Sequence, residues 1–277
     1  MEEGSLWGMI DAQPVVFPVP VHELNTALIE FVVPVEAARR LLPGDAFELV
    51  ETEPGLAQVN VAALDYRRGA WGPAAAVETM LTARPVGAPP SATGIFLCDG
   101  PISQRFASEV ASRAMGTSKR LETVEVDTTD ADVRFRVSCG DERALTLRLP
   151  RVSGARERHR LDIAGYSCLD GEPYVTRLEI DMPAAAVDPA DVDLSIGTGW
   201  FADTLRSLGL PRKPDRCWWG EGLTAVYHRP ARLTAAARAG VTGRGGDAQG
   251  DTRGDARETG EAEGTEPLSG GAGPASG

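Results

Sequence analysis

The sequence is poor in the residues on which several common kinds of protein depend. Its four cysteines lie far apart, without a Cys-x-x-Cys pair and without histidine at ligand spacing, so we expect neither a metal site nor a disulfide framework. A cluster of surplus lysine and arginine is also missing. The net charge of -12 and the pI near 4.8 argue against nucleic-acid binding, because binding to phosphates requires such a cluster.

Long apolar runs are missing too. No stretch reaches the roughly 18 apolar residues that a membrane-spanning helix needs. Residues 1–11 are acidic and polar, whereas a secretory signal begins with a basic region and continues with an apolar one. These absences predict a cytoplasmic protein with neither a membrane nor a nucleic acid as its partner. The chain of 277 residues, 42% of them hydrophobic, is sufficient for one substantial core.

The composition changes near the end of the chain. From Arg238 onward it consists mainly of Gly, Ala, Thr, Asp, Glu and Arg, and Leu268 is the only large apolar residue after Val241. Such a segment buries too little apolar surface to offset the entropy lost on ordering. We therefore predict one folded domain over residues 1–237, followed by a disordered Gly/Ala/Asp/Glu-rich tail over 238–277.

Strand patterns dominate the predicted domain. Apolar and polar residues alternate with the period of two that a half-buried sheet requires. Residues 133–137 and 145–149, separated by the turn residues Gly140-Asp141, predict a hairpin. Further strands are predicted at Ala27–Val33, Leu56–Tyr66, Ala75–Val86, Gly94–Cys98, Leu121–Val126, Tyr174–Met182 and Leu223–His228.

Helical patterns are few and short. They cover Pro34–Leu42, Ile102–Met115 and Trp200–Leu208, and in the second of them apolar residues recur one turn apart. Strands that do not alternate with helices argue against βαβ units. The expected fold class is therefore α+β, a mainly antiparallel β barrel or sandwich with a few attached short helices.

Lysine is scarce in this chain. Only Lys119 and Lys213 stand among 28 basic residues. Arginine serves equally well for a surface charge, but it keeps its proton at working pH and cannot act as an amine nucleophile. Either lysine can have remained by chance, yet their settings differ. Lys213 lies between two prolines in a charged loop, where its amine is expected to be solvated. Lys119 follows a predicted helix and stands beside the permanent cation of Arg120.

The surroundings of Lys119 resemble a known family. Ser118-Lys119-Arg120-Leu121 is similar to the Pro-Lys-Lys-Leu segment of the acetoacetate decarboxylase family, with serine in place of proline. About forty residues upstream, Val77-Glu78-Thr79 followed by Pro85-Val86 is similar to the strand with the family's catalytic glutamate. The resemblance extends from about Phe17 to His228.

This resemblance assigns roles to three residues. It implies that Lys119 forms a Schiff base, that Arg120 disfavours the protonated form of the amine, and that Glu78 positions the substrate or transfers protons. Acetoacetate decarboxylase is itself the standard example of a lysine activated by a neighbouring cation.

Two differences from the family pattern bear on the reaction. In the decarboxylase pattern an arginine of the first strand binds the substrate carboxylate, and here Leu24 takes its place, with His22 and Asn25 nearby. The pocket carboxylate expected in the next strand is replaced by Asn60, which becomes a candidate substrate-binding residue.

The resemblance implies a Schiff-base lyase that acts on a small keto acid and needs no metal or organic cofactor. Decarboxylation of a β-keto acid is the family default. An aldolase-dehydratase or cyclase acting on a 2-oxo acid such as pyruvate is the alternative that the missing arginine favours. A non-catalytic small-molecule-binding relative is the third. Since family members assemble into oligomers, we also expect a homo-oligomer.

Two other motifs are given structural interpretations. The stretch from Gly197 to Ala202 formally fits a dinucleotide-binding pattern but lacks the surrounding βαβ unit, so it predicts a turn into a short helix. The basic residues Arg151, Arg156, Arg158, His159 and Arg160 are interpreted as a solvated loop or subunit contact rather than an anion site.

Overall fold

The structure is a computed structural model that describes residues 4–152 and 156–234. The boundary predicted after residue 237 and the predicted tail over 238–277 lie outside the described residues, so both stay predictions. In the described part, none of the helices combines the length and the apolar character needed to cross a membrane.

Strands form most of the described part. They are β1 (Ser5–Ile10), β2 (Gln13–Phe17), β3 (Val19–Pro34), β4 (Phe47–Leu49), β5 (Glu51–Glu53), β6 (Leu56–Gly69), β7 (Ala74–Pro85), β8 (Gly94–Leu97), β9 (Gly100–Ile102), β10 (Lys119–Leu121), β11 (Thr123–Thr128), β12 (Asp132–Cys139), β13 (Glu142–Pro150), β14 (Glu157–Leu169), β15 (Glu172–Val187), β16 (Asp193–Ile196), β17 (Arg216–Tyr227) and β18 (Ala231–Arg232). The helices are α1 (Val35–Arg39), α2 (Arg105–Ala114) and α3 (Trp200–Ser207), with 3-10 turns at Pro90–Ala92 and Pro189–Asp191.

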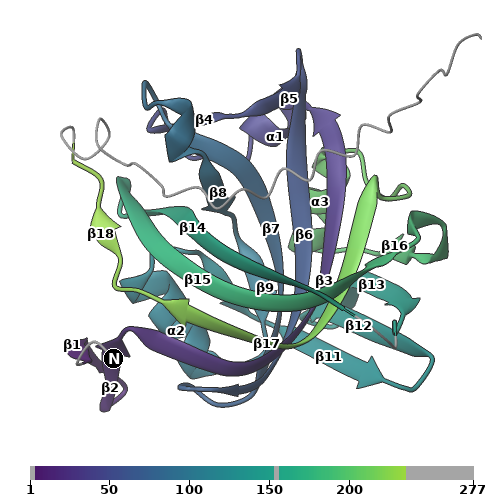
Figure 1. Cartoon of the computed structure of the whole chain (residues 1–277), viewed down its shortest axis with the longest axis horizontal. Coiled ribbons are helices and arrows are strands. Elements are labelled where there is room, and N and C mark those ends of the chain that lie inside the picture. The colour runs from purple at the N-terminus through teal and green to yellow at the C-terminus, as the bar shows by residue number, and fades with distance from the viewer. Residues whose placement is uncertain (1–3, 153–155, 235–277) are drawn as a thin grey trace, which may run out of the picture. The chain divides into compact units, whose positions relative to one another are not determined.

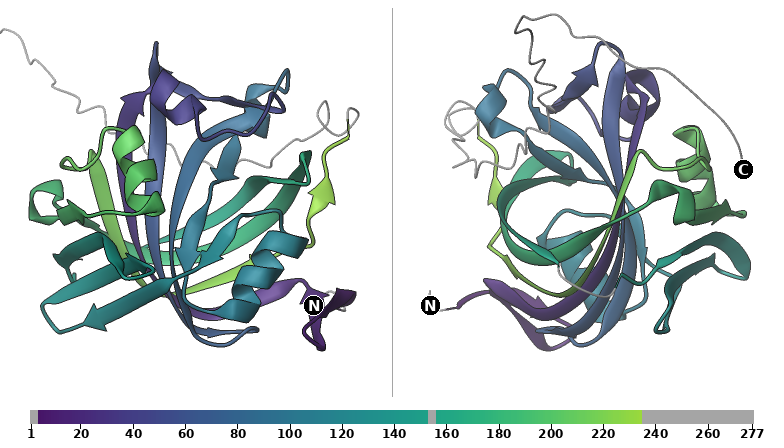
Figure 2. Two further views of the ribbon diagram at one scale, coloured as in Figure 1. Left: turned by 180° about the vertical axis from the view of Figure 1, so that it is seen from behind. Right: turned by 45° about the vertical axis from the view of Figure 1, so that its right-hand side comes forward.

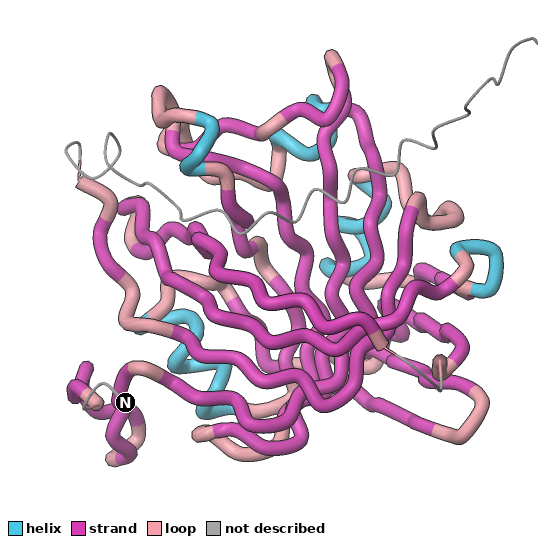
Figure 3. Tube along the Cα trace, viewed as in Figure 1, coloured by secondary structure: helices cyan, strands magenta, loops and turns pink. Residues whose placement is uncertain are grey.

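Seven strands close into a barrel. Their order is β7, β8, β14, β15, β17, β3 and β6, and the barrel closes because β6 also pairs with β7. All neighbours run antiparallel except β8 and β14, which are parallel. Figures 1 and 3 show these long strands curving around one another. The short strand β9 extends the sheet from β7, and β10 pairs in parallel with β9.

The barrel strands have two apolar faces. Ala62 and Leu64 of β6 belong to an inner cluster that is also contacted by Ile180 from β15, across the barrel. Val61 and Ala63, with the opposite orientation, belong to the main core. The sheet β11-β12-β13-β16 and helix α3 complete that core on the outer side of the barrel, as Figure 2 shows.

Helix α2 is fixed on two sides. Ala107 packs with Ile102 against the inner cluster. Val110 packs against the β1–β2 hairpin in a third cluster that includes Phe17. The side chain of Gln104 caps the first turn by accepting a hydrogen bond from the Ala107 amide. The C-terminal end of α2 is therefore a fixed starting point for the segment that carries Lys119.

The predicted fold class is confirmed. The described part is a mainly antiparallel β barrel with a few attached short helices. The predicted hairpin is the β12–β13 pair, in which Val137 stands opposite Leu145. The predicted turn at Gly197–Ala202 leads into α3, with Gly199 as its N-cap residue. The strand predicted over Leu121–Val126 is divided into β10 and β11 at Glu122.

The loop predicted for the basic cluster holds for Arg151 and Arg156 but is wrong for residues 158–160, and the alternative of a subunit contact stays a prediction. Residues from Glu157 onward form the long strand β14, which pairs with β15 over its whole length. Arg158 and Arg160 make ion pairs with Asp181 of β15, at 2.9 and 3.8 Å. Because polar residues occupy both faces of this strand at its first four positions, the sequence there shows no alternation of apolar and polar residues.

Candidate active site

A short connection from α2 to β10 positions Lys119. Gly116 follows the helix with φ of +67°, a left-handed conformation that glycine adopts without strain. A Cβ atom there would lie 3.1 Å from the Ser167 hydroxyl oxygen, so the space also favours glycine. The chain then enters β10, where Lys119 pairs with Gly100 of β9.

Two serines of α2 hold the main chain of Lys119. The Ser108 hydroxyl donates to the Lys119 carbonyl oxygen at 2.7 Å, in a buried hydrogen bond. The Lys119 amide donates to Ser112 Oγ at 3.3 Å. Both bonds use backbone atoms, so they fix the origin of the side chain and leave the amine unoccupied.

The Lys119 amine is buried beside Glu78 of β7. Nζ lies 3.0 Å from Glu78 Oε1, and the two side chains are only 4% and 15% exposed. The contact satisfies the distance for an ion pair, but its direction does not make a hydrogen bond, and Nζ has no hydrogen-bond partner among the described residues. The amine thus has a carboxylate beside it and hydrogen-bonding capacity that the described residues do not use.

Gly100 makes room for this pair. A Cβ atom at this position would lie 2.4 Å from the Val77 carbonyl oxygen and 3.2 Å from Lys119 Nζ. The first distance is a severe clash with backbone, which cannot move as a flexible side chain can. Gly100 therefore allows β9 to lie close to β7, and its backbone covers one side of the amine.

Asn60 lies on the same inner face as Glu78, one row of residues away. On β6 it stands opposite Met80 of β7, whereas Ala62 stands opposite Glu78. Asn60 is 7% exposed. Its Oδ1 atom accepts a hydrogen bond of 3.4 Å from Gln58. The structure thus brings Lys119, Glu78 and Asn60 to one face of the barrel.

Arg120 is not brought to this face. Strand alternation directs it away from Lys119, and its side chain is 51% exposed. Its guanidinium lies 3.6 Å from Asp99 and stacks on the Trp200 ring, 4.2 Å from the centroid. An assisting role for Arg120 stays a prediction, and in this arrangement it can act only through the field of its charge.

Solved structures share this arrangement of strands, although no family model matches the chain and no curated protein matches it. The acetoacetate decarboxylase of Legionella pneumophila has a TM-score of 0.62 at 12% identity, over 78% of this chain and 87% of its own. Another acetoacetate decarboxylase structure has a TM-score of 0.58 at 14% identity, over 78% and 89%. The enduracididine biosynthesis enzyme MppR, complexed with pyruvate, has a TM-score of 0.56 at 12% identity, over 78% and 90%.

This chain has the acetoacetate decarboxylase-like fold. The match covers most of each solved chain, so the fold implied by the resemblance around Lys119 is confirmed. Within this fold the lysine and the glutamate, which lie far apart in the sequence, meet on the inner face of the barrel.

Two tyrosines on the inner face of the acetoacetate decarboxylase-like barrel escaped the sequence analysis. The hydroxyl oxygens of Tyr66 and Tyr227 lie 3.2 Å apart. Burial, together with the charge of Glu78 and despite the hydrogen bond from Tyr66, raises the pKa of Tyr227 to about 12. Burial, Tyr227 and Glu78 likewise raise the pKa of Tyr66. Both phenols are therefore neutral proton donors within the electrostatic reach of Glu78. The sequence contained one signal for them: Tyr66 and Tyr227 follow Leu64 and Ala225 by two residues, so the period of two places each tyrosine on the same face as its apolar predecessor.

Two further neighbours define the chemistry of the site. Leu24, at the position expected for the carboxylate-binding arginine, is 5% exposed and belongs to the inner apolar cluster. Burial raises the pKa of the Cys98 thiol to about 12, against the lowering effect of the Lys119 charge. The thiol is thus protonated and does not compete with the amine as a nucleophile.

Lys213 lies in an exposed loop, in agreement with the prediction. Its Nζ also donates to the carbonyl oxygens of Ala190 and Val192, at 2.7 and 2.9 Å. These two hydrogen bonds engage the amine, whereas Nζ of Lys119 has no hydrogen-bond partner among the described residues.

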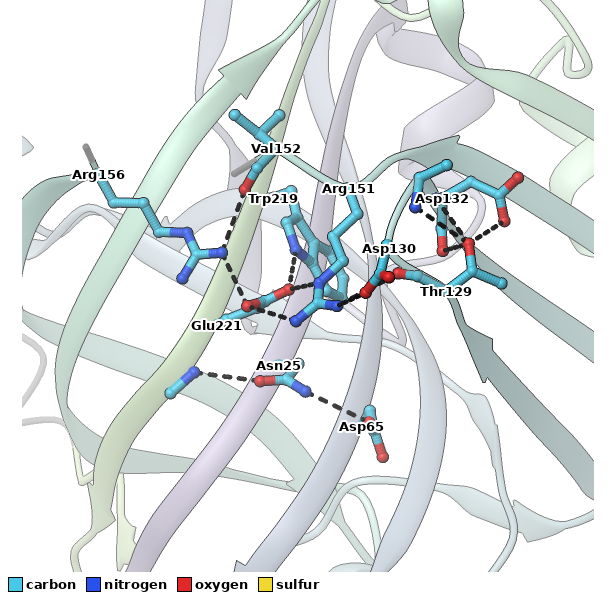
Figure 4. Close-up of polar contacts among 12 residues, drawn as sticks. Asn25, Asp65, Thr129, Asp130, Asp132, Arg151, Val152, Arg156, Trp219 and Glu221 are labelled. Carbon is cyan, nitrogen blue, oxygen red and sulfur yellow. Dashed lines mark hydrogen bonds and ion pairs between the residues drawn. The ribbon is translucent and has the colours of Figure 1, made fainter. Parts of the chain in front are cut away.

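A second polar cluster occupies a cleft of about 430 Å³ on another part of the barrel (Figure 4). There Glu221 accepts hydrogen bonds from Arg151 Nε at 2.6 Å, Arg156 Nη2 at 2.8 Å and Trp219 Nε1 at 2.9 Å. Burial raises the pKa of Glu221, but these hydrogen bonds outweigh it and lower the pKa to about 2. Part of the predicted basic cluster is therefore used in an internal ion-pair network.

Proposed function

We propose that this protein is a Schiff-base carbon–carbon lyase, similar to acetoacetate decarboxylase, that acts on a small keto acid. The observation that carries the proposal is the buried Lys119 amine, which lies 3.0 Å from Glu78 and has no hydrogen-bond partner among the described residues. Such an amine is available for attack on a carbonyl carbon, and the adjacent carboxylate is placed to move protons.

The reaction follows from the imine. The neutral Lys119 amine adds to the ketone, and loss of water gives a protonated imine. When the β-carboxylate leaves as carbon dioxide, the electrons of the broken carbon–carbon bond move into the imine and form an enamine. Protonation of the enamine carbon and hydrolysis of the imine release the ketone and restore the amine. Glu78 is the group that exchanges these protons.

A second reaction of the same imine is favoured by one observation. Leu24 replaces the arginine that would hold a substrate carboxylate, and it packs in the inner apolar cluster. An aldolase-dehydratase or cyclase forms the enamine by removing a proton from a 2-oxo acid such as pyruvate, and the enamine then attacks an aldehyde. MppR, a neighbour in fold, has been solved with the condensation product of pyruvate and imidazole 4-carboxaldehyde.

Borohydride trapping tests the proposal. The protein is incubated at pH 7 with acetoacetate or with pyruvate, reduced, and mapped by peptide mass spectrometry. We expect a reduced adduct on Lys119 and none on Lys213, which serves as an internal control because both of its carbonyl partners are in place. Saturable binding of a keto acid without any adduct would instead identify a non-catalytic binding protein.

The products separate the two reactions. Release of carbon dioxide from acetoacetate without an added aldehyde supports decarboxylation. Consumption of pyruvate only in the presence of an aldehyde supports the aldolase-dehydratase. The homo-oligomer implied by the family resemblance stays a prediction, and light scattering of the full chain tests it.

A further inference from the structure

A group of three polar residues lies on the inner face of the barrel beside the reacting pair. Asn60 of β6 stands opposite Glu30 of β3. The Gln58 side-chain amide donates to Glu30 Oε2 at 2.9 Å and to Asn60 Oδ1 at 3.4 Å. These residues, the Glu30–Gln58–Asn60 cluster, are surrounded on the same face by Leu28, Met80 and other apolar side chains of the inner cluster.

The cluster has hydrogen-bonding capacity that the protein does not use. The Glu30 side chain is 10% exposed, and its Oε1 atom lies 3.9 Å from Arg216 Nε, beyond hydrogen-bond distance. The Asn60 amide nitrogen has no acceptor among the described residues. Burial raises the pKa of Glu30, with an opposing contribution from Arg216 and a smaller one from Asp215 that adds to burial. Neither Glu30 Oε1 nor the Asn60 amide nitrogen belongs to the fully buried atoms that lack a partner, so a ligand can reach both.

The position of the cluster suits a ligand attached to Lys119. Adjacent strands lie about 4.8 Å apart and two residues along a strand span about 6.7 Å, so the Cα atoms of Glu78 and Asn60 are about 8 Å apart. Glu30 is one strand farther, at about 12 Å. Ala62, opposite Glu78, adds only a methyl group to this face. One extended molecule can therefore contact both sites.

We propose that the Glu30–Gln58–Asn60 cluster binds the far end of the substrate, and that this end carries a cationic hydrogen-bond donor such as a guanidinium or ammonium group. This inference rests on the proposed function for the reacting end of the substrate. The cluster has a carboxylate and two amide oxygens as acceptors, and the nearest cation, Arg216, has a side chain that is 68% exposed. A second substrate carboxylate would be repelled by Glu30, and Leu24 cannot neutralise it.

Four 2-oxo acids of matched length test the far-end specificity. They are 6-guanidino-2-oxohexanoate, 8-hydroxy-2-oxooctanoate, 2-oxononanoate and 2-oxooctanedioate, which differ in the group at the far end. The half-saturating concentration for borohydride-trapped adduct is measured for each with the full chain. We expect the guanidinium compound to saturate at about tenfold lower concentration than the methyl compound, since a charge-assisted hydrogen bond is worth that much. The dicarboxylate should be the weakest.

Variants assign this preference to the cluster. Glu30→Gln should reduce the guanidinium preference to less than about twofold, whereas Glu53→Gln, an exposed glutamate on β5, should leave it unchanged. Asn60→Asp adds a carboxylate and should increase the preference, so the test survives if Glu30→Gln does not fold. An unchanged preference in Glu30→Gln, or a preference for the methyl or dicarboxylate compound in the unmodified chain, overturns the inference.

Calorimetry separates this inference from the proposed function. Lys119→Met cannot form an imine, but it keeps the cluster, so its binding of the four compounds should retain the same order. If the unmodified chain forms no adduct with any compound, the proposed function fails. In that case the order in which Lys119→Met binds the four compounds decides the inference about the far end of the substrate.

Discussion

Glu221 and Glu78, two carboxylates of this barrel that lie beside basic groups, differ in how many hydrogen bonds they accept. Glu221 accepts hydrogen bonds from two arginines and a tryptophan, and its pKa falls to about 2. Among the described residues, Glu78 is paired with the Lys119 amine, without a hydrogen bond between them. A carboxylate that accepts hydrogen bonds on both oxygens has a fixed charge and stabilises the fold, whereas a pair without a hydrogen bond keeps an amine and a carboxylate available for chemistry.

The largest effect expected from this contrast is on activity. Lys119→Arg keeps the positive charge but cannot form an imine, so turnover of the keto acid should fall at least about 1000-fold, or ~4 kcal/mol. Steady-state kinetics and borohydride trapping measure it. Lys213→Arg is the matched control and should keep full activity. Retained adduct formation in Lys119→Arg would remove Lys119 from the mechanism.

The next effect is on stability. Glu221→Gln removes the carboxylate shared by Arg151 and Arg156, although Arg151 still lies 3.8 Å from Asp130, and should lower the free energy of unfolding by about 2–4 kcal/mol. Urea denaturation followed by circular dichroism measures the loss. Adduct formation at Lys119 should be unchanged at temperatures where the variant is folded. A variant as stable as the unmodified chain would show that the four hydrogen bonds to Glu221 contribute nothing net.

Acid should remove the same stabilisation. The pKa of Glu221 is lowered from 4.5 to about 2 in the folded chain, so its contribution is complete above about pH 4.5 and is lost as the pH falls toward 2. Allowing for solvent near the cleft, we expect it to be on the order of 2 kcal/mol. Denaturation at pH 5 and at pH 2.5 should show a smaller loss for Glu221→Gln than for the unmodified chain. Equal losses would contradict the prediction.

A smaller effect is expected from the anchor of the Lys119 main chain. Ser108→Ala removes a buried hydrogen bond of 2.7 Å to the Lys119 carbonyl, which keeps only the longer bond of 3.4 Å from Ser112, at a cost of about 1–2 kcal/mol. Because the lysine is then less well positioned, kcat should decrease more than KM changes. Ser207→Ala, which removes an exposed hydroxyl on α3, is the control. A stability loss with unchanged kcat would make Ser108 merely structural.

The smallest effect is expected at Arg120. Its guanidinium is paired with Asp99, stacks on Trp200 and is half exposed, so solvent screens its charge. Arg120→Gln should therefore change turnover by less than about tenfold. A decrease comparable to that of Lys119→Arg would show that the neighbouring cation is essential to the reactivity of the amine.

The sequence pointed to Lys119 and Glu78 but not to the residues that surround them in the fold. The scarcity of lysine, the helix predicted before Lys119 and the family resemblance made Lys119 the candidate, and the resemblance pointed to Glu78. A period of two assigns residues to the faces of a strand but does not say which strands are adjacent. The contacts of Gly100 and the pairing of Glu30 with Asn60 both depend on such adjacency. The cleft around Glu221 depends on it as well, because Arg156 follows one strand and Glu221 lies within another.

The missed strand β14 has a related cause. Its first residues, from Glu157 to Arg160, are polar on both faces, and all four are exposed or partly exposed. Pairing with β15 and ion pairs to Asp181 stabilise it where apolar burial does not. A pattern based on hydrophobicity cannot detect a strand of this kind.

The close approach of β9 to β7 at Gly100 has a stereochemical consequence. Because main chain lies against one side of the Lys119 nitrogen, an imine formed there has one shielded face and one open face. A proton added to the enamine carbon must then arrive from the open side. In deuterated water, a keto acid with a substituted α-carbon should give a product in which the label has a single handedness.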